Sequence, residues 1–366
     1  MLKPSSRRNV PPQLTGRRLR TRSYGPIFPK VLIISQFNYE QEAIFKYFPE
    51  LLQQSYEVPG FSPLYPDVNC NNAGTLCSMT NGEGEANAAA SITALLYASH
   101  FDLTHTYIIL TGIAGVNPSL GTTGTVGFAK YAVQLDLTYE FDARQIPQNF
   151  SSGLVPQGNT KPVSYDPSIP PQDTRSAYPR NIYGTEVYTL NGNLRDKFRT
   201  LASKAPLNDT TAAASYRAKY DQKAARAPPS VLACDSQTSN VYWSGSKLTA
   251  AFSAYTQLLT NGSGALCMSQ QEDNASLEGL LRGHAAGKID FARVSILRAA
   301  SDFVQAPKGV EETDHLLVNQ QGGFSVALEN IGIAARPVVK DVLGNWAAYE
   351  GGVKSGNKVG SLLVSY

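Results

Sequence analysis

Hydrophobic residues occur along this chain in short continuous runs, with amphipathic stretches between them. Residues 31–35, 106–110 and 295–303 are apolar runs typical of buried parallel strands. The first run is followed by a helical stripe made of Ala43, Ile44, Tyr47, Phe48, Leu51 and Leu52. Further strands are predicted at 75–80, 125–135, 231–234 and 264–268, and further helices at 86–99, from residue 247 and from residue 272. This alternation predicts an α/β fold with a parallel or mixed central sheet.

Glycine and proline mark the expected breaks in this pattern. Residues 81–85 are expected to form a glycine-rich turn, and residues 111–115 place glycines just past a predicted strand, where they would let the backbone approach a ligand. Pro337 should separate two C-terminal helices, near 324–334 and 338–347. Residues 140–228 have proline- and serine-rich loops before helices around 194–202 and 211–225, so we expect an insertion outside the sheet. The expected organisation is one domain over 30–366, with an insertion at about 140–228.

The first 29 residues differ from the rest of the chain in composition. Residues 1–30 hold eight of the 32 Lys and Arg residues and no acid. The remaining 24 basic residues face 29 acidic ones, so the body carries about −5, which argues against nucleic-acid binding. We expect residues 1–29 to be a disordered basic tail or a propeptide cut at its paired arginines. No run reaches the roughly 18 apolar residues that a membrane-spanning helix requires.

Cysteines and glycosylation sequons favour a secreted protein. Cys70, Cys77, Cys234 and Cys267 allow three pairings, and Cys70 with Cys77 plus Cys234 with Cys267 is the most local. Asn-x-Ser/Thr sequons occur at Asn149, Asn208, Asn261 and Asn274. Asn274 falls inside a predicted helix, where we expect it to be unmodified. The expected location is extracellular or at the cell surface, with any signal peptide already removed.

Carboxylates recur just after the predicted strands. Glu40 or Glu42 follows the first, Glu272 follows the strand ending at Met268, and Asp302 ends the run at 295–303. Ligands of α/β proteins sit at this end of the strands. Three converging acids suit glycosidic cleavage, in which one protonates the leaving group, one orients the sugar and one activates water. Each also has a structural interpretation: a helix cap, a charge at a helix N-terminus, or a solvated helix-face acid. The spacing of histidines and cysteines predicts no metal site.

Several motifs give the chain a family resemblance. Residues 298–302 (RAASD), 110–115 (LTGIAG) and 268–272 (MSQQE) resemble the nucleoside phosphorylase and nucleosidase superfamily. From about residue 30 the chain more closely resembles the fungal purine nucleoside permease family, on the evidence of residues 183–188, 260–264 and 272–275. The resemblance implies a three-layer nucleoside-phosphorylase-like fold with a central mixed sheet flanked by helices, no cofactor, and a homodimer or larger assembly. Because a transporter needs spanning segments, we follow the superfamily's chemistry rather than the word permease.

The resemblance also implies roles for individual residues. Asp302 matches the aspartate that protonates purine N7, and Glu42, or Glu40 in the other register, matches the glutamate that polarises water. The implied ribose contacts are Glu272, Gln271 and Thr111. The implied base contacts are Tyr242, Trp243, Phe303, Ile113 and Gly115. Stacking on the base suits Tyr242 and Trp243, although core packing under a loop explains them equally well.

The expected nucleophile depends on where arginines lie. Phosphorylases of this superfamily hold phosphate with arginines after the first and third strands, whereas residues 37–39 and 111–112 contain none. Arg298 lies within a strand, and we expect it to be structural. We therefore predict a purine nucleoside N-ribohydrolase that acts on inosine, guanosine or adenosine with water as the nucleophile. The alternatives are a phosphate-dependent purine nucleoside phosphorylase and a non-catalytic nucleoside-binding protein that assists uptake.

Overall fold

A large mixed sheet forms the centre of the molecule. The computed structural model describes residues 26–163 and 178–364. The main path of the sheet runs, in spatial order, through β15 (Gly360–Ser361), β10 (Val187–Thr189), β7 (Tyr131–Gln134), β12 (Ser236–Thr238), β13 (Met268–Gln270), β5 (Tyr107–Val116), β1 (Val31–Ser35), β4 (Leu76–Thr80), β3 (Asp67–Cys70) and β2 (Gln54–Glu57). From β5 the sheet branches into β14 (Val294–Phe303), β6 (Val126–Phe128) and β11 (Val231–Ala233). A separate hairpin pairs β8 (Thr138–Glu140) with β9 (Leu154–Pro156).

The strands that carry the predicted site pair with β5. Both β1 and β14 run parallel to β5, and β13 meets its end antiparallel. The carboxyl ends of β1, β5 and β14 therefore lie at one edge of the sheet, where ligands of α/β proteins bind. At the far edge, β2, β3 and β4 pair antiparallel. The predicted α/β class with a mixed sheet is confirmed.

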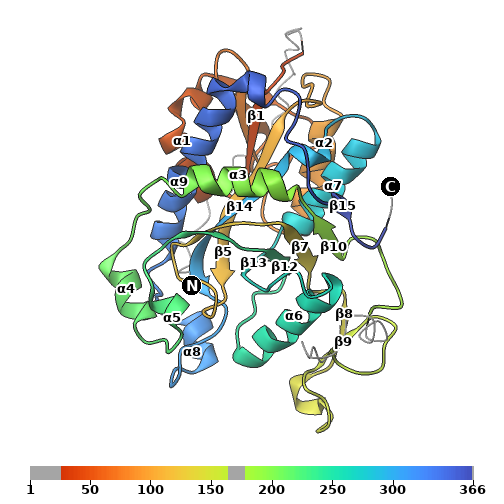
Figure 1. Cartoon of the computed structure of the whole chain (residues 1–366), viewed down its shortest axis with the longest axis vertical. Helices are drawn as coiled ribbons and strands as arrows, with labels where there is room; N and C mark the ends of the chain where they lie inside the picture. The colour runs from red at the N-terminus through yellow and green to blue at the C-terminus, as the bar shows by residue number, and fades with distance from the viewer. Residues whose placement is uncertain (1–25, 164–177, 365–366) are drawn as a thin grey trace.

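Helices cover both faces of the sheet and give the fold three layers (Figure 1). One face packs against α1 (Asn38–Tyr47), α3 (Gly192–Ala202) and α9 (Phe324–Gly344). The other packs against α2 (Glu85–Leu96) and α7 (Asp273–Ala285). The alternation of β1 explains both contacts: Val31 and Ile33 face the first core, and Leu32 and Ile34 face the second. All four are at most 1% exposed, as expected for a strand between two helical layers.

Further elements extend the fold beyond the carboxyl ends of the strands. Figure 1 places α6 (Ser246–Leu259), α4 (Thr211–Arg217), α5 (Lys223–Arg226) and α8 (Glu312–Leu317) in the lower part of the view, with the β8–β9 hairpin. Turns of 3-10 helix occupy Pro49–Leu52, Ala143–Gln145, Phe291–Arg293 and Trp346–Ala348. Within the described ranges, no helix has both the length and the apolar character needed to cross a membrane.

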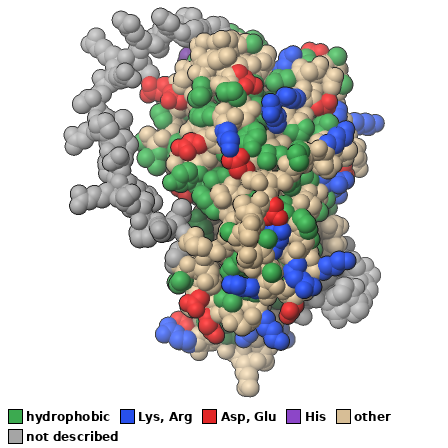
Figure 2. Space-filling model, turned by 90° about the vertical axis from the view of Figure 1, so that its left-hand side faces the viewer, with side chains coloured by type: hydrophobic (Ala, Val, Ile, Leu, Met, Phe, Trp, Pro, Cys, Tyr) green, Lys and Arg blue, Asp and Glu red, His purple; other side chains and the backbone are tan. Residues whose placement is uncertain are grey.

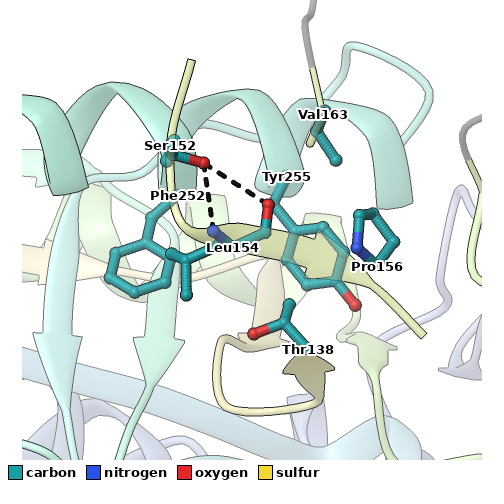
Figure 3. A pocket seen from close by; sticks show the side chains of 8 residues that line it. Thr138, Ser152, Leu154, Pro156, Val163, Phe252 and Tyr255 are labelled. Carbon is teal, nitrogen blue, oxygen red and sulfur yellow. Dashed lines mark hydrogen bonds between the residues drawn. The ribbon is translucent and has the colours of Figure 1, made fainter. Parts of the chain in front are cut away.

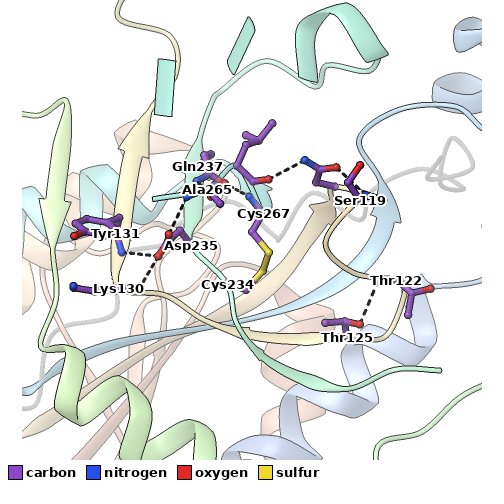
Figure 4. Close-up of a disulfide and its surroundings, with 12 residues drawn as sticks. Ser119, Thr122, Thr125, Lys130, Tyr131, Cys234, Asp235, Gln237, Ala265 and Cys267 are labelled. Atoms are coloured by element: carbon purple, nitrogen blue, oxygen red, sulfur yellow. Dashed lines mark hydrogen bonds between the residues drawn. A yellow bond between two sulfur atoms is a disulfide. The ribbon is translucent and has the colours of Figure 1, made fainter. Parts of the chain in front are cut away.

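Two disulfides form, with the most local of the three possible pairings. Cys70–Cys77 joins β3 to β4, and Cys234–Cys267 joins the end of β11 to the start of β13. Next to the second bond, the carboxylate of Asp235 accepts hydrogen bonds from the backbone N–H groups of Lys130, Tyr131 and Ala265 (Figure 4). This cluster fixes the starts of β7 and β13, and β13 leads directly into Glu272.

The glycines of residues 111–115 lie inside a strand, so the prediction that the strand ends at residue 110 is wrong. β5 continues through them to Val116 and pairs with β14 along its whole length. A Cβ added to Gly112 would lie 2.3 Å from Arg298 Nη1 and 2.9 Å from Glu40 Oε1. Glycine is needed here because side chains of the protein itself, rather than a turn, occupy the space beside the backbone.

The expectation that residues 140–228 lie outside the sheet is wrong for part of this segment. Within it, β10 pairs antiparallel with β7, and α3 packs in the core beside α9. The helices expected around 194–202 and 211–225 correspond to α3 and to the pair α4 and α5. Whether the remainder is an insertion stays a prediction.

Three further boundaries differ from the sequence pattern. Pro337 lies inside a continuous α9, because burial of Ala327, Ile331, Val338 and Val342 along one side offsets the lost backbone hydrogen bond. The strand expected at 125–135 is divided into β6 and β7, and the strand expected at 264–268 begins only at 268. Most of the predicted basic tail is outside the described residues, but Ile27 in its last part pairs with Phe101.

Candidate active site

Arg298 is the centre of a buried ionic network at the carboxyl edge of the sheet. Its side chain is 1% exposed, and its Nη2 lies 2.6 Å from Asp273 Oδ1 and 3.2 Å from Glu272 Oε2. Its Nη1 donates to the carbonyl of Ile113, and its Nε donates to Asp273. Burial lowers the pKa of Arg298, but the charges of Asp273 and Glu272 outweigh burial and raise it. The guanidinium is therefore charged and held by acids and a backbone carbonyl of the protein, as a structural role requires.

Glu40 enters the same network from the first turn of α1. Its Oε1 accepts the Ile113 N–H at 2.8 Å, and its Oε2 accepts the Gln36 N–H at 2.7 Å. The side chain is 1% exposed. Burial raises the pKa of Glu40 to about 8, although Arg298 and the two N–H donors favour the ionised form. This carboxyl group can therefore gain or lose a proton near neutral pH.

The structure separates the two candidate glutamates of this loop. Glu42 is exposed on α1, two residues from Glu40, whereas Glu40 points into the protein. A helical offset of two residues places side chains on different faces, which explains the difference. We therefore keep Glu40, and not Glu42, in the proposal below.

Glu272 connects the network to the loop before α2. It lies just before α7, accepts the Gly84 N–H through Oε1 at 3.1 Å and pairs with Arg298 through Oε2. Burial raises the pKa of Glu272, and Arg298 and Gly84 lower it only in part. The carboxylate is held at both oxygens, so its position is fixed before any ligand binds.

Asp302 lies at an irregularity of β14. The register against β5 shifts between Ala300 and Asp302, so that Asp302 pairs with Gly115. A Cβ on Gly115 would come within 2.9 Å of Asp302 Oδ1, so glycine leaves room for the carboxyl group. The hydroxyl of Ser301 donates to Oδ2 at 2.5 Å. Burial raises the pKa of Asp302, while Ser301 and His315 lower it in part. Relative to an ordinary aspartate, Asp302 favours its protonated form.

The three acids lie along the carboxyl end of β5. Glu40 accepts the Ile113 N–H, Glu272 pairs with Arg298, whose Nη1 donates to the Ile113 carbonyl, and Asp302 lies beside Gly115. Tyr242 is 69% exposed, and its pKa is raised to about 12, first by partial desolvation and then by the charges of nearby acids, which include Glu272, Asp302 and Glu40.

The side chain of Trp243, the residue after Tyr242, packs inside the protein. Its indole N–H donates to the hydroxyl of Ser269, and its ring packs against Phe252. This arrangement corresponds to the core-packing interpretation. Phe303 is likewise 2% exposed and packs 4.2 Å from the ring of Tyr220, measured between centroids.

The remaining predicted residues lie around the network in different roles. Ile113 and Gly115 lie on β5, next to Glu40 and Asp302 respectively. Thr111 is buried, and its hydroxyl donates to the carbonyl of Ile34. Gln271 donates from Nε2 to the carbonyl of Asn240. The side chains of Thr111 and Gln271 thus donate hydrogen bonds to backbone carbonyls of the protein.

Sequence reasoning missed Asp273 and the central position of Arg298. Asp273 is fully buried and also accepts a hydrogen bond from Ser236. A usable signal was present, because an arginine inside an apolar strand must find a buried partner of opposite charge. The sequence does not reveal which acid serves, because the partners lie on separate elements.

A small cavity lies elsewhere, between the β8–β9 hairpin and α6 (Figure 3). Its lining includes Thr138, Leu154, Phe252 and Tyr255, and its volume is about 10 Å³, enough for about one water molecule. None of the network residues lines it. On the surface face shown in Figure 2, acidic and basic side chains are interspersed.

Comparison with known proteins gives consistent family names. Residues 28–354 match the model of a family described as purine nucleoside permease. A purine nucleoside permease of Candida albicans is 40% identical over 354 residues, covering 94% of this chain and 84% of that protein. A Schizosaccharomyces pombe protein named as a probable purine nucleoside permease is 37% identical over 321 residues, covering 87% of this chain and 90% of that protein. A 5′-methylthioadenosine/S-adenosylhomocysteine nucleosidase structure from Neisseria meningitidis is similar at a TM-score of 0.47 and 14% identity, covering 86% of this chain and 99% of that one.

Proposed function

The chain belongs to the purine nucleoside permease family, and we propose that it is a purine nucleoside N-ribohydrolase, which converts a purine nucleoside and water into free base and ribose. The names of the relatives supply the ligand class. The chemistry rests on one observation: Glu40 and Asp302, whose carboxyl groups both have raised pKa values, flank β5 at the carboxyl edge of the sheet. Two carboxyl groups with different partners suit paired acid and base roles.

Asp302 is the proposed general acid. In its protonated form it donates a proton to N7 of the purine as the bond between the base and the ribose breaks, so the base leaves without excess negative charge. The hydroxyl of Ser301 holds Oδ2, which leaves Oδ1 to face the substrate beside Gly115. Ile113 and Gly115 border this position on β5, and we retain them as base contacts.

Glu40 is the proposed general base. Its ionised form takes a proton from water while the water oxygen bonds to C1′ of the ribose. With a pKa of about 8, roughly one tenth of the free protein has Glu40 ionised at pH 7. The hydrolysis rate should therefore increase with pH up to about 8, provided that Asp302 stays protonated.

Glu272 and Tyr242 are the proposed binding residues. Each oxygen of Glu272 uses one lone pair within the protein, so the carboxylate can still accept hydrogen bonds from ribose hydroxyl groups. Tyr242 is exposed over the acids and can stack on the purine. Four other predicted contacts have side chains that already pack or bond within the protein: Trp243, Phe303, Thr111 and Gln271. We propose that they support the site and do not bind the substrate directly.

Charge favours water over phosphate as the nucleophile. The guanidinium of Arg298 is already used by Asp273, Glu272 and the carbonyl of Ile113. A phosphate dianion would have to approach several carboxyl groups without a free cation from this network. Water meets no such repulsion.

One assay tests the reaction class directly. Purified protein is incubated with inosine or adenosine, with and without phosphate, and the free base and sugar products are measured. Ribose formed without phosphate supports the proposal. Ribose 1-phosphate formed only in the presence of phosphate would instead identify a phosphorylase.

A second candidate is a non-catalytic nucleoside-binding protein that assists uptake. The observation in its favour is the name permease carried by both fungal relatives. In the same assay, saturable nucleoside binding with no release of base would support this candidate and refute hydrolysis.

We also propose that the protein is extracellular and glycosylated. The two disulfides favour an oxidising compartment. Asn149, Asn208 and Asn261 are exposed, whereas Asn274 is 1% exposed and bonds to Thr238 and Thr185. A homodimer or larger assembly remains a proposal, to be tested by sedimentation.

A further inference from the structure

Two side chains bond to the backbone at the end of β14. They lie along the edge of the strand that has no partner strand there. β6 pairs with β14 only as far as Leu297–Ala299, so the backbone of Phe303 has no partner strand on that side. Its N–H donates to Gln321 Oε1 at 2.8 Å, and its carbonyl accepts from His315 Nε2 at 2.8 Å. Both peptide groups of Phe303, the residue directly after Asp302, are thus fixed from the region of α8.

His315 is itself fixed by a contact with α4. It is 1% exposed, and its Nδ1 lies 2.6 Å from the hydroxyl oxygen of Tyr216. A carbonyl can only accept, so Nε2 carries the hydrogen given to Phe303, while Nδ1 shares the second bond with the hydroxyl of Tyr216. His315 therefore links α4, α8 and the end of β14 through two directional bonds.

The register shift of β14 makes this link important. The strand pairs regularly with β5 as far as Ala300, and the irregularity then falls directly before Asp302. A bulge leaves its extra residue unpaired and locally disrupts the ladder, so contacts from outside the pair of strands help to fix the backbone there. The carboxyl group of Asp302 receives its own bond from Ser301, which lies at the same irregularity.

We propose that His315 and Gln321 form a brace that positions Asp302, acting through the backbone of Phe303. His315 is then a positioning residue for the reaction and not a catalytic residue. The inference rests on the proposed function, in which Asp302 is the general acid. A displacement of about 1 Å at a catalytic group can cost about 10²-fold in rate. Loss of the brace should therefore reduce kcat, whereas KM should change little, because Glu272 and Tyr242 lie on other elements.

Three variants of the full chain separate positioning from a loss of stability. His315→Leu removes the donor to Phe303, and His315→Gln keeps an N–H donor at the position of Nε2. His284→Leu is the control for loss of an imidazole, because the exposed His284 contacts the Ile289 carbonyl and the Phe291 N–H before the start of β14, at the opposite end of the strand from Phe303. We expect His315→Leu to lower kcat for inosine about 10²-fold with KM within about threefold of wild type. His315→Gln should restore most of the rate, and His284→Leu should leave it unchanged.

A second readout does not require activity. Amide hydrogen exchange over residues 300–305 should be faster in His315→Leu than in wild type, and near wild type in His315→Gln and His284→Leu. Wild-type kcat or unchanged exchange in His315→Leu would overturn the brace. If the wild type hydrolyses no nucleoside, the proposed function fails, and the exchange pattern alone then supports or refutes the brace.

Discussion

Replacing Glu40 by glutamine should change how the stability of the protein depends on pH. In the native protein burial raises the pKa of Glu40 to about 8, whereas an unfolded glutamate titrates at its ordinary value of 4.5. Between these two values the unfolded chain has lost the proton and the native protein retains it. The free energy of unfolding of the wild type therefore falls as pH rises through this interval.

The size of the effect follows from the interval. Each pH unit costs about 1.4 kcal/mol when one proton is retained on folding, so the interval between 4.5 and about 8 amounts to about 5 kcal/mol. Glutamine does not titrate, so in Glu40→Gln this residue adds no pH dependence to the free energy of unfolding. It adds a constant cost of about 1–3 kcal/mol, because its NH₂ group would face one of the N–H donors of Gln36 and Ile113.

The measurement is chemical denaturation of Glu40→Gln and wild type at pH 5, 6, 7 and 8. We expect Glu40→Gln to be the less stable protein near pH 5 and to gain on wild type by about 1.4 kcal/mol per pH unit, so that the curves cross. Glu42→Gln is the control, because Glu42 is exposed on the same helix. A constant difference between Glu40→Gln and wild type from pH 5 to 8 would refute the reasoning. It would mean that Arg298 keeps Glu40 ionised throughout.

Other predictions test the acid, the network and the glycosylation sites. Asp302→Asn should lower kcat about 10²–10⁴-fold with little change in KM, and wild-type turnover would contradict its role as general acid. Arg298→Met should lower the free energy of unfolding by about 3–5 kcal/mol, because Asp273 and Glu272 would lose their buried cation, and denaturation at pH 7 measures this loss. After expression in a eukaryotic secretory host, glycopeptide mass spectrometry should find Asn274 unmodified, since a glycan there would contradict its burial, and should find glycans at the exposed sequons Asn149, Asn208 and Asn261.

Much of the fold could be predicted because the strands are buried on both faces. β1 appears in the sequence as an apolar run and β14 as a longer one interrupted by Arg298, and the small residues of α2 follow a clear glycine turn. β5 was harder, because Gly112 is typical of a turn when read alone. Residue 112 must be glycine because the side chain of Arg298, on the neighbouring strand, occupies the space of a Cβ. Local sequence does not reveal this contact.

The candidate site was predictable to the same extent. Acids at strand ends could be recognised one at a time, and the structure places Glu40, Glu272 and Asp302 beside the end of β5 and Arg298. The sequence could not decide between Glu40 and Glu42, because the entry angle of α1 determines which one is buried. It also could not show the contact between His315 and Phe303, which depends on how α8 packs against the end of β14.

The structural and chemical roles of Glu40 are compatible. Its two oxygens hold the Gln36 and Ile113 N–H groups, and such bonds alone would make it a helix-stabilising acid. Each carboxylate oxygen, however, has two lone pairs, so one per oxygen remains for a proton or a water molecule. The backbone bonds fix the direction of those remaining lone pairs before substrate arrives, which is the preorganisation that a general base needs. The same contacts that anchor α1 to β5 therefore support the proposal that Glu40 activates water.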